Sequence, residues 1–201
     1  MVIVDYGVGN LFSLKSSLDF LGFSCTVTSD PKEISKADKI FLPGVGAFAD
    51  AIHKLSENGL DQIIRQRAAD GVPLLGICLG MQMLFNKSYE YGEHAGLGLI
   101  PGDVCPIAAD LSQPLKIPQM GWNSLRFRRE SPLFRYIHDG DFVYYVHSYY
   151  AKNCAESIIA TSDYGVEITG AVQNGNVYGT QFHPEKSGQV GLAILQAFCE
   201  L

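Results

Sequence analysis

The chain lacks three features that define particular classes of protein. It has no excess of positive charge: 15 Lys and Arg against 21 Asp and Glu give a net charge of −6, which offers nothing to attract nucleic acid. No apolar run reaches the roughly 20 residues that a membrane-spanning helix requires. The opening stretch MVIVDYG has no basic region of the kind that begins a secretory signal. We therefore expect neither nucleic acid nor a membrane as a partner.

Cysteine is present, but not in a pattern typical of disulfides or metal sites. The five cysteines are odd in number and widely scattered, and no C-x-x-C pair occurs: Cys25, Cys78, Cys105, Cys154 and Cys199. This pattern argues against a disulfide framework and against zinc. It predicts a reducing, cytoplasmic setting, and we expect no metal ion and no cofactor.

The first half of the chain alternates short apolar strands with helical stretches. With 47% hydrophobic and 18% charged residues, the composition is that of a globular protein. The patterns predict strands at 2–4, 25–28, 39–42 and 72–77 and helices at 11–21 and 51–69, with a polar connection over 31–37. Such alternation predicts an α/β fold with a mostly parallel central sheet flanked by helices.

After residue 90 the pattern changes to glycine, proline and short β-runs. These runs lie at 97–100, 104–107, 124–128, 142–150, 158–161, 171–173 and 177–182, and residues 190–201 return to helical spacing. Asn174-Gly175 predicts a hairpin between the last two runs. We expect an antiparallel β extension in the second half and, since no linker or repeat interrupts the chain, a single domain over 1–201.

Residues 72–85, VPLLGICLGMQMLF, carry the strongest functional signal. Cys78 lies at the centre of Gly-Ile-Cys-Leu-Gly, between an apolar run and a helical stretch. This arrangement is typical of a nucleophile elbow, in which flanking glycines relieve crowding around a strained residue. The helix N-terminus would favour the thiolate of Cys78. The alternative is that Cys78 is a small buried residue between packing glycines, as free cysteines usually are.

Among the histidines, His183 has the most informative neighbours. It follows the run 177–182 and begins His183-Pro184-Glu185, where proline favours an extended residue before it. Extended backbone places residues 183 and 185 on the same side, so Glu185 can orient the imidazole and stabilise its protonated form. We expect the other histidines at the core edge (His147) or in surface positions (His53, His94 and His138).

Acyl transfer also needs N–H donors for a developing oxyanion. The elbow supplies the N–H of Leu79, and the glycine loop Gly44-Val45-Gly46 can supply a second donor. Gln82, one turn after Cys78, can bind the polar end of a small substrate, or it is a capping or surface residue. The alternative of a dinucleotide-binding loop at 44–49 leaves the cysteine, histidine and glutamate without a role.

With these motifs in place, the chain resembles the class I (triad-type) glutamine amidotransferases. Within that family, four stretches are similar to the glutaminase subunits of imidazole glycerol phosphate synthase, an enzyme of histidine biosynthesis: 5–10, PGVGAF at 43–48, MGWN at 120–123 and HPEKS at 183–187. The resemblance runs nearly end to end. It implies that the triad Cys78, His183 and Glu185 hydrolyses glutamine to glutamate and ammonia through a cysteine thioester.

The resemblance also implies where substrate and partner bind. Glutamine would lie near Gly46, Gln82 and the 147–149 stretch, which includes Ser148 and Tyr149; Ser148 stands where the family pattern often has Thr. The implied partner is a cyclase subunit, a (β/α)8 barrel, which forms a heterodimer with the glutaminase and receives its ammonia. The residues that match interface positions are Asn10, Trp122, Tyr144 and Lys186.

Trp122 is the only tryptophan in the chain, and its surroundings show no helical or strand period. We therefore predict that it lies in a loop, either as an interface anchor or as a core plug. Other functions stay open on the sequence alone: a stand-alone cysteine peptidase or hydrolase, a binding subunit without catalysis, or an oxidoreductase that uses the 44–49 loop.

Overall fold

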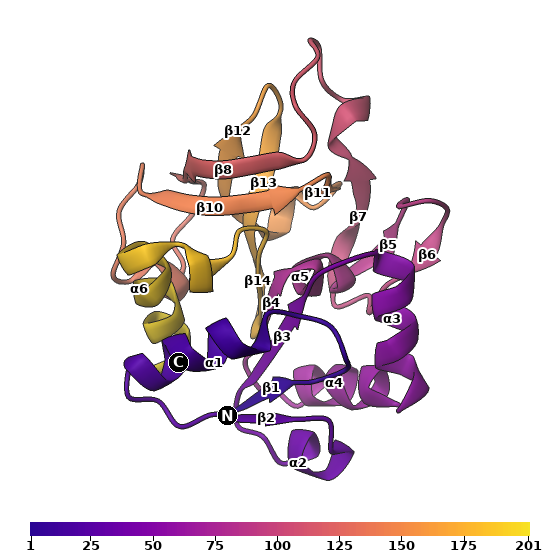
Figure 1. Ribbon diagram of the computed structural model, residues 1–201, viewed down its shortest axis with the longest axis vertical. Coiled ribbons are helices and arrows are strands. Elements are labelled where there is room, and N and C mark those ends of the chain that lie inside the picture. The colour runs from indigo at the N-terminus through magenta and orange to yellow at the C-terminus, as the bar shows by residue number, and fades with distance from the viewer.

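The computed structural model describes all 201 residues, Met1–Leu201, and is built around an eight-stranded mixed sheet (Figure 1). The strand order is β2-β1-β3-β4-β14-β13-β12-β9. The first five strands are parallel: β2 (Thr26–Thr28), β1 (Val2–Val4), β3 (Ile40–Gly44), β4 (Leu74–Cys78) and β14 (Val177–Thr180). The other three are antiparallel: β13 (Glu167–Asn174), β12 (Ile158–Asp163) and β9 (Arg126–Phe127). The predicted α/β class, with its antiparallel extension, is confirmed.

Successive residues of a strand point to opposite faces of the sheet. Each face has its own apolar core, and helices cover both. Val2 and Val4 belong to a core shared with α2 (Pro31–Ser35), α3 (Phe48–Glu57), α4 (Leu60–Ala69) and α5 (Leu79–Met83). Ile3, between them, belongs to a second core shared with α1 (Leu11–Phe20) and α6 (Gly188–Cys199). The centre of the sheet is therefore buried on both sides, which explains the short apolar strands β1, β3 and β4.

Two smaller sheets complete the second half of the chain. One pairs β8 (Gln119–Ser124) with β10 (Phe142–His147) and crosses the upper part of the molecule in Figure 1. The other has the order β11-β7-β5-β6, with β11 (Tyr149–Lys152), β7 (Ile100–Pro106), β5 (Phe85–Ser88) and β6 (His94–Ala95). Short 3₁₀ turns lie between strands at η1 (Ile107–Ala109), η2 (Pro132–Phe134) and η3 (Ala155–Ser157), and η4 (Pro184–Lys186) connects β14 to α6.

The structure differs from the sequence predictions in four elements. The run predicted at 97–100 forms no strand over 97–99, and β7 begins only at Ile100. The segment predicted as a polar connection contains α2, because the Asp30 side chain accepts a hydrogen bond from the Lys32 N–H and Pro31 suits the first helical turn. The helix predicted over 51–69 is two helices, α3 and α4, separated at Gly59 with its left-handed φ of 67°. Trp122 lies in strand β8 and not in a loop, because β10 pairs with this segment along its whole length.

No helix has the length and hydropathy that crossing a bilayer would require. None of the His, Cys, Asp and Glu side chains gather in a group of three or more that could hold a metal ion. The residues that line the main cavity come from the carboxyl ends of parallel strands and from the two small sheets beside them.

Candidate active site

Cys78 is the last residue of β4 and directly precedes α5. Its backbone is strained, with φ of 55° and ψ of −112°. Close packing of glycine backbones maintains this strain. A Cβ atom on Gly80 would lie 1.8 Å from the carbonyl oxygen of Leu42, and one on Gly76 would lie 2.7 Å from the carbonyl oxygen of Gly80. The turn predicted from the Gly-x-Cys-x-Gly pattern is thus present, and it presents the thiol at the carboxyl end of the parallel sheet.

His183 and Glu185 lie in line behind the thiol. The Nδ1 atom of His183 lies 2.9 Å from Oε1 of Glu185, and the two side chains are 2% and 3% exposed. The other ring nitrogen, Nε2, is buried and has no hydrogen-bond partner in this arrangement, and Cys78 is its neighbour. The backbone N–H of His183 donates to the carbonyl of Tyr144 at 2.9 Å. Cysteine, imidazole and carboxylate therefore form one connected series.

The two buried histidines of this region have opposite pKa shifts. Burial lowers the pKa of His183, but its interactions with Cys78 and Glu185 outweigh burial and raise that pKa to about 10. Burial lowers the pKa of His147 to about 4, and its Nδ1–H donates to the carbonyl of Tyr149 at 2.8 Å. These opposite shifts favour the protonated imidazole at His183, once the Cys78 proton has moved to it, and the neutral imidazole at His147. His183 is therefore the histidine suited to exchange a proton with Cys78.

A cavity of about 540 Å³ opens in front of this series. Eight of the residues predicted for the site line it: Val45, Gly46, Cys78, Leu79, Gln82, Ser148, Tyr149 and His183. Two others do not line it, because Glu185 lies behind the imidazole and Gly44 is buried against the elbow. The structure thus brings together predicted residues from four separate parts of the chain: 44–46, 78–82, 148–149 and 183–185.

The glycine loop after β3 has a fixed base and a free tip. Gly44 pairs in register with Cys78, and a Cβ atom on it would lie 2.8 Å from both the N of Gly80 and the hydroxyl of Tyr6. The Tyr6 hydroxyl donates to the carbonyl of Pro43 at 2.8 Å. Beyond this base, Val45 is 41% exposed and Gly46 has a left-handed φ of 96° with open space around it. Gly44 is therefore held in the sheet with no room for a side chain, whereas residues 45 and 46 lie beyond the sheet, with open space at Gly46.

Gln82 is buried in the wall of the cavity, so it is neither a capping nor a surface residue. Its Nε2 atom donates to the carbonyl of Tyr149 and to Oε1 of Gln181, both at 3.0 Å. Because both N–H groups already have protein acceptors, this nitrogen supports the cavity wall. The interior of the protein, and not a ligand, determines its orientation.

The sequence analysis missed Glu90 and Tyr91, which also line the cavity. Oε2 of Glu90 accepts a hydrogen bond from the N–H of Phe48 at 2.6 Å, at the start of α3. Tyr91 has a left-handed φ of 54°, and its ring lies 6.4 Å from that of Tyr149. Both belong to a polar connection between β5 and β6 that shows no motif. Only the fold brings Glu90 to the cavity, where it supplies a carboxylate.

The four residues predicted for a partner interface lie near residues 183–188, on the Glu185 side of the series. Asn10 Nδ2 donates to Oε1 of Glu185 at 3.4 Å, and Lys186 is exposed on the following turn. Trp122 and Tyr144 are opposite each other on β8 and β10, with ring centroids 6.2 Å apart. Trp122 is 56% exposed, which excludes the core-plug alternative.

Comparison with known proteins identifies the family. A model of the glutamine amidotransferase class-I family matches residues 2–200. An imidazole glycerol phosphate synthase subunit HisH from Listeria monocytogenes serotype 4a is 50% identical over 201 residues, which is 100% of this chain and 95% of that protein. The protein of the same name from Moorella thermoacetica is 50% identical over 202 residues, with coverage of 100% and 94%.

Solved structures share the fold at low identity. A crystal structure of a glutamine amidotransferase superimposes with a TM-score of 0.77 at 19% identity, covering 99% of this chain and 97% of that one. The structure of PurLQS from Thermotoga maritima gives 0.72 at 20% identity, with coverage of 99% and 96%. Fold, family model and full-length relatives agree: the chain belongs to the class-I glutamine amidotransferase family and, within it, to the HisH subunits of imidazole glycerol phosphate synthase.

Proposed function

We propose that the chain hydrolyses glutamine to glutamate and ammonia as the glutaminase subunit of imidazole glycerol phosphate synthase. The observation that carries this proposal is the buried series of Cys78, His183 and Glu185, opening on a cavity large enough for an amino acid. The names of the full-length relatives support the assignment to this enzyme.

In the first half-reaction, the Cys78 thiolate attacks the side-chain amide carbon of glutamine, its proton having passed to Nε2 of His183. A tetrahedral oxyanion forms, for which the N–H of Leu79 and a reoriented peptide at 45–46 are the donors. His183 returns the proton to the amide nitrogen, the C–N bond breaks and ammonia leaves. The product on the enzyme is a glutamyl thioester.

In the second half-reaction, water attacks the thioester carbon while His183 accepts a proton from it. The C–S bond breaks, glutamate leaves and the thiolate is regenerated beside a protonated His183. Glu185 stabilises this imidazolium in both halves through its contact with Nδ1. At the other end of the cavity, the carboxylate of Glu90 complements the ammonium group of an amino-acid substrate.

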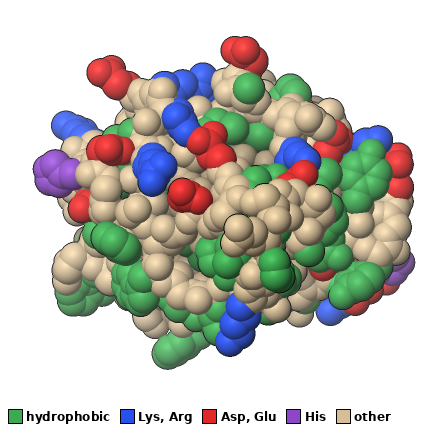
Figure 2. All heavy atoms as spheres, turned by 90° about the horizontal axis from the view of Figure 1, so that it is seen from above, with side chains coloured by type: hydrophobic (Ala, Val, Ile, Leu, Met, Phe, Trp, Pro, Cys, Tyr) green, Lys and Arg blue, Asp and Glu red, His purple; other side chains and the backbone are tan.

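The proposal includes a partner, a cyclase subunit with a (β/α)8 barrel that forms a heterodimer with this chain and receives the ammonia. Exposed apolar side chains on β8 and β10 support it: Met120 is 58%, Trp122 56% and Phe142 55% exposed. Figure 2 looks onto this end of the molecule, and apolar side chains reach its surface mainly in the lower half of the view, with most charged side chains in the upper half. Five free cysteines support a cytoplasmic setting.

The test is glutamate release by the wild type and by Cys78→Ala in the presence of the cyclase subunit. We expect a loss of about ten-thousandfold or more, because removing a nucleophile that acts with its base abolishes the covalent route. Thermal unfolding of the variant should match the wild type. Substantial glutamine hydrolysis by folded Cys78→Ala would reject the mechanism. Activity on a peptide or with a nicotinamide cofactor would favour the alternative functions.

A further inference from the structure

Gln181 is a fully buried amide that contacts the sulfur of Cys78. It follows β14 and precedes His183 by two residues, and its side chain is 0% exposed. Its Nε2 atom lies 3.8 Å from Sγ of Cys78, and its Oε1 accepts a hydrogen bond from Gln82 at 3.0 Å. The backbone N–H of Gln181 donates to the carbonyl of Gly170 at 2.8 Å, which fixes the residue on the sheet.

The hydrogen bonds determine which end of the Gln181 amide faces the sulfur. The backbone carbonyl of Tyr149 can only accept, so the nitrogen of Gln82 must point toward it. The second N–H of that nitrogen then donates to the oxygen of Gln181. With its oxygen engaged, Gln181 directs its own NH₂ group at Cys78. A single backbone carbonyl in the cavity wall thus determines the orientation of a donor to the nucleophile.

This donor matters when the sulfur is charged. In the resting thiol, the S–H group donates to the carbonyl of Val146 at 3.9 Å. After the proton moves to His183, the sulfur carries a negative charge in a buried position and needs donors. The protonated imidazole is one, and Gln181 is a second that carries no charge of its own.

We propose that Gln181 is a further catalytic residue, whose amide N–H stabilises the Cys78 thiolate and, through Gln82, couples it to Tyr149 in the substrate cavity. The inference rests on the proposed role of Cys78 as nucleophile. The titratable groups near the sulfur are His183 with Glu185 behind it, Tyr6 beside the glycine loop, and His147 on β10. Replacement of the uncharged Gln181 leaves all of them in place.

The experiment measures the rate at which iodoacetamide alkylates Cys78 as a function of pH, in the full chain, by mass analysis of the peptide that contains Cys78. In Gln181→Met the pH of half-maximal rate should rise by about one unit, since a hydrogen bond to a charged group is worth about tenfold or more in equilibrium. The matched control is Thr180→Val, because Thr180 is equally buried and its hydroxyl has no hydrogen-bond partner. The control profile should coincide with that of the wild type.

A second variant keeps the proposal testable if Gln181→Met does not fold. Gln82→Met retains Gln181 but removes the bond that orients it, so the profile should shift in the same direction by a smaller amount. Unchanged profiles in folded Gln181→Met or Gln82→Met would overturn the proposal. Alkylation needs no glutamine, so this outcome is distinct from failure of the proposed function, which glutamate release by Cys78→Ala would reveal.

Discussion

At the scale of single residues, the surroundings of a side chain decide its chemistry more than its type does. His183 and His147 lie in the same cavity wall and are both buried. Contacts with the Glu185 carboxylate and the Cys78 sulfur raise the pKa of His183, whereas burial lowers the pKa of His147. The spacing of His183 and Glu185 made this pair predictable from the sequence. Glu90 was not predictable, because only tertiary packing brings it to the site. Gln181 has the same two-residue spacing from His183, but its contact with the Cys78 sulfur comes from packing between distant segments.

The raised pKa of His183 predicts a pH dependence of stability. Its folded-state value of about 10 lies above the ordinary 6.5, so the folded protein binds the proton more tightly than the unfolded chain does. The resulting stabilisation is complete below pH 6.5 and is lost as the pH rises to about 10. Denaturant titrations should show the free energy of unfolding falling over this range, and falling less in His183→Gln. Parallel curves for the two proteins would contradict the assignment.

At the scale of elements, the elbow between β4 and α5 determines the geometry of the site. Its glycines permit backbone contacts with β3 that no other residue allows, and they hold Cys78 in its strained conformation. The Gly-x-Cys-x-Gly pattern and the alternation of strand and helix made this part of the fold predictable. The strand that contains Trp122 was not predicted, because Gly121 and Asn123 on either side of the tryptophan are unusual in strands. Its partner strand β10 lies about twenty residues further along the chain.

Replacement of Gly80 by Ala should disrupt the elbow. The added Cβ would lie 1.8 Å from a backbone oxygen of β3, so either strand or helix must move. We expect a loss of about 3 kcal/mol or more in the free energy of unfolding, at the upper end of overpacking effects. Gly71→Ala is the control, because its φ is 83° but its surroundings are open; its loss should be about 1–2 kcal/mol. Denaturant unfolding measures both, and equal losses would show that the elbow tolerates a side chain.

At the scale of the whole molecule, the series of Cys78, His183 and Glu185 lies between two faces. The cavity with Glu90 and Tyr149 lies on one side of His183, and Asn10, bonded to Glu185, lies on the other. Trp122 and Tyr144 extend that second side on β8 and β10. A partner bound there would contact the residues that hold the triad in place. The free tip of the glycine loop, Val45 and Gly46, gives such a partner a peptide to reorient.

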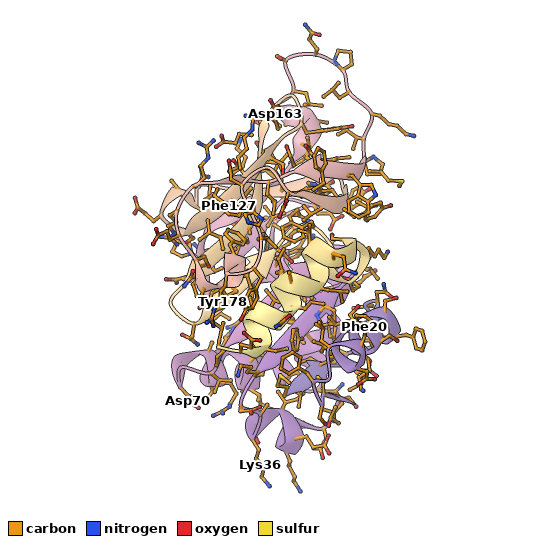
Figure 3. The ribbon with its side chains drawn as sticks, turned by 90° about the vertical axis from the view of Figure 1, so that its left-hand side faces the viewer. Phe20, Lys36, Asp70, Phe127, Asp163 and Tyr178 are labelled. Carbon is orange, nitrogen blue, oxygen red and sulfur yellow. The ribbon has the colours of Figure 1, made fainter.

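Trp122→Ala should weaken association with the cyclase subunit by about 2 kcal/mol or more, as central aromatic anchors do, and change the stability of the isolated chain by about 0.5 kcal/mol or less. Calorimetric titration and denaturant unfolding measure the two effects. Phe20→Ala is the control, because Figure 3 shows Phe20 pointing into solvent at the end of α1. Equal affinity of the two variants for the partner would place the interface elsewhere.

The central claim is that glutamine hydrolysis passes through a thioester on Cys78, and it is tested most directly by trapping that intermediate. The complex with the cyclase subunit is mixed with glutamine, quenched in acid during turnover, digested and analysed by mass. The account predicts a glutamyl group on the peptide that contains Cys78, present while glutamine remains and absent once it is consumed. A glutamyl group on another cysteine, or glutamate formed at every quench time without any adduct on Cys78, would contradict it.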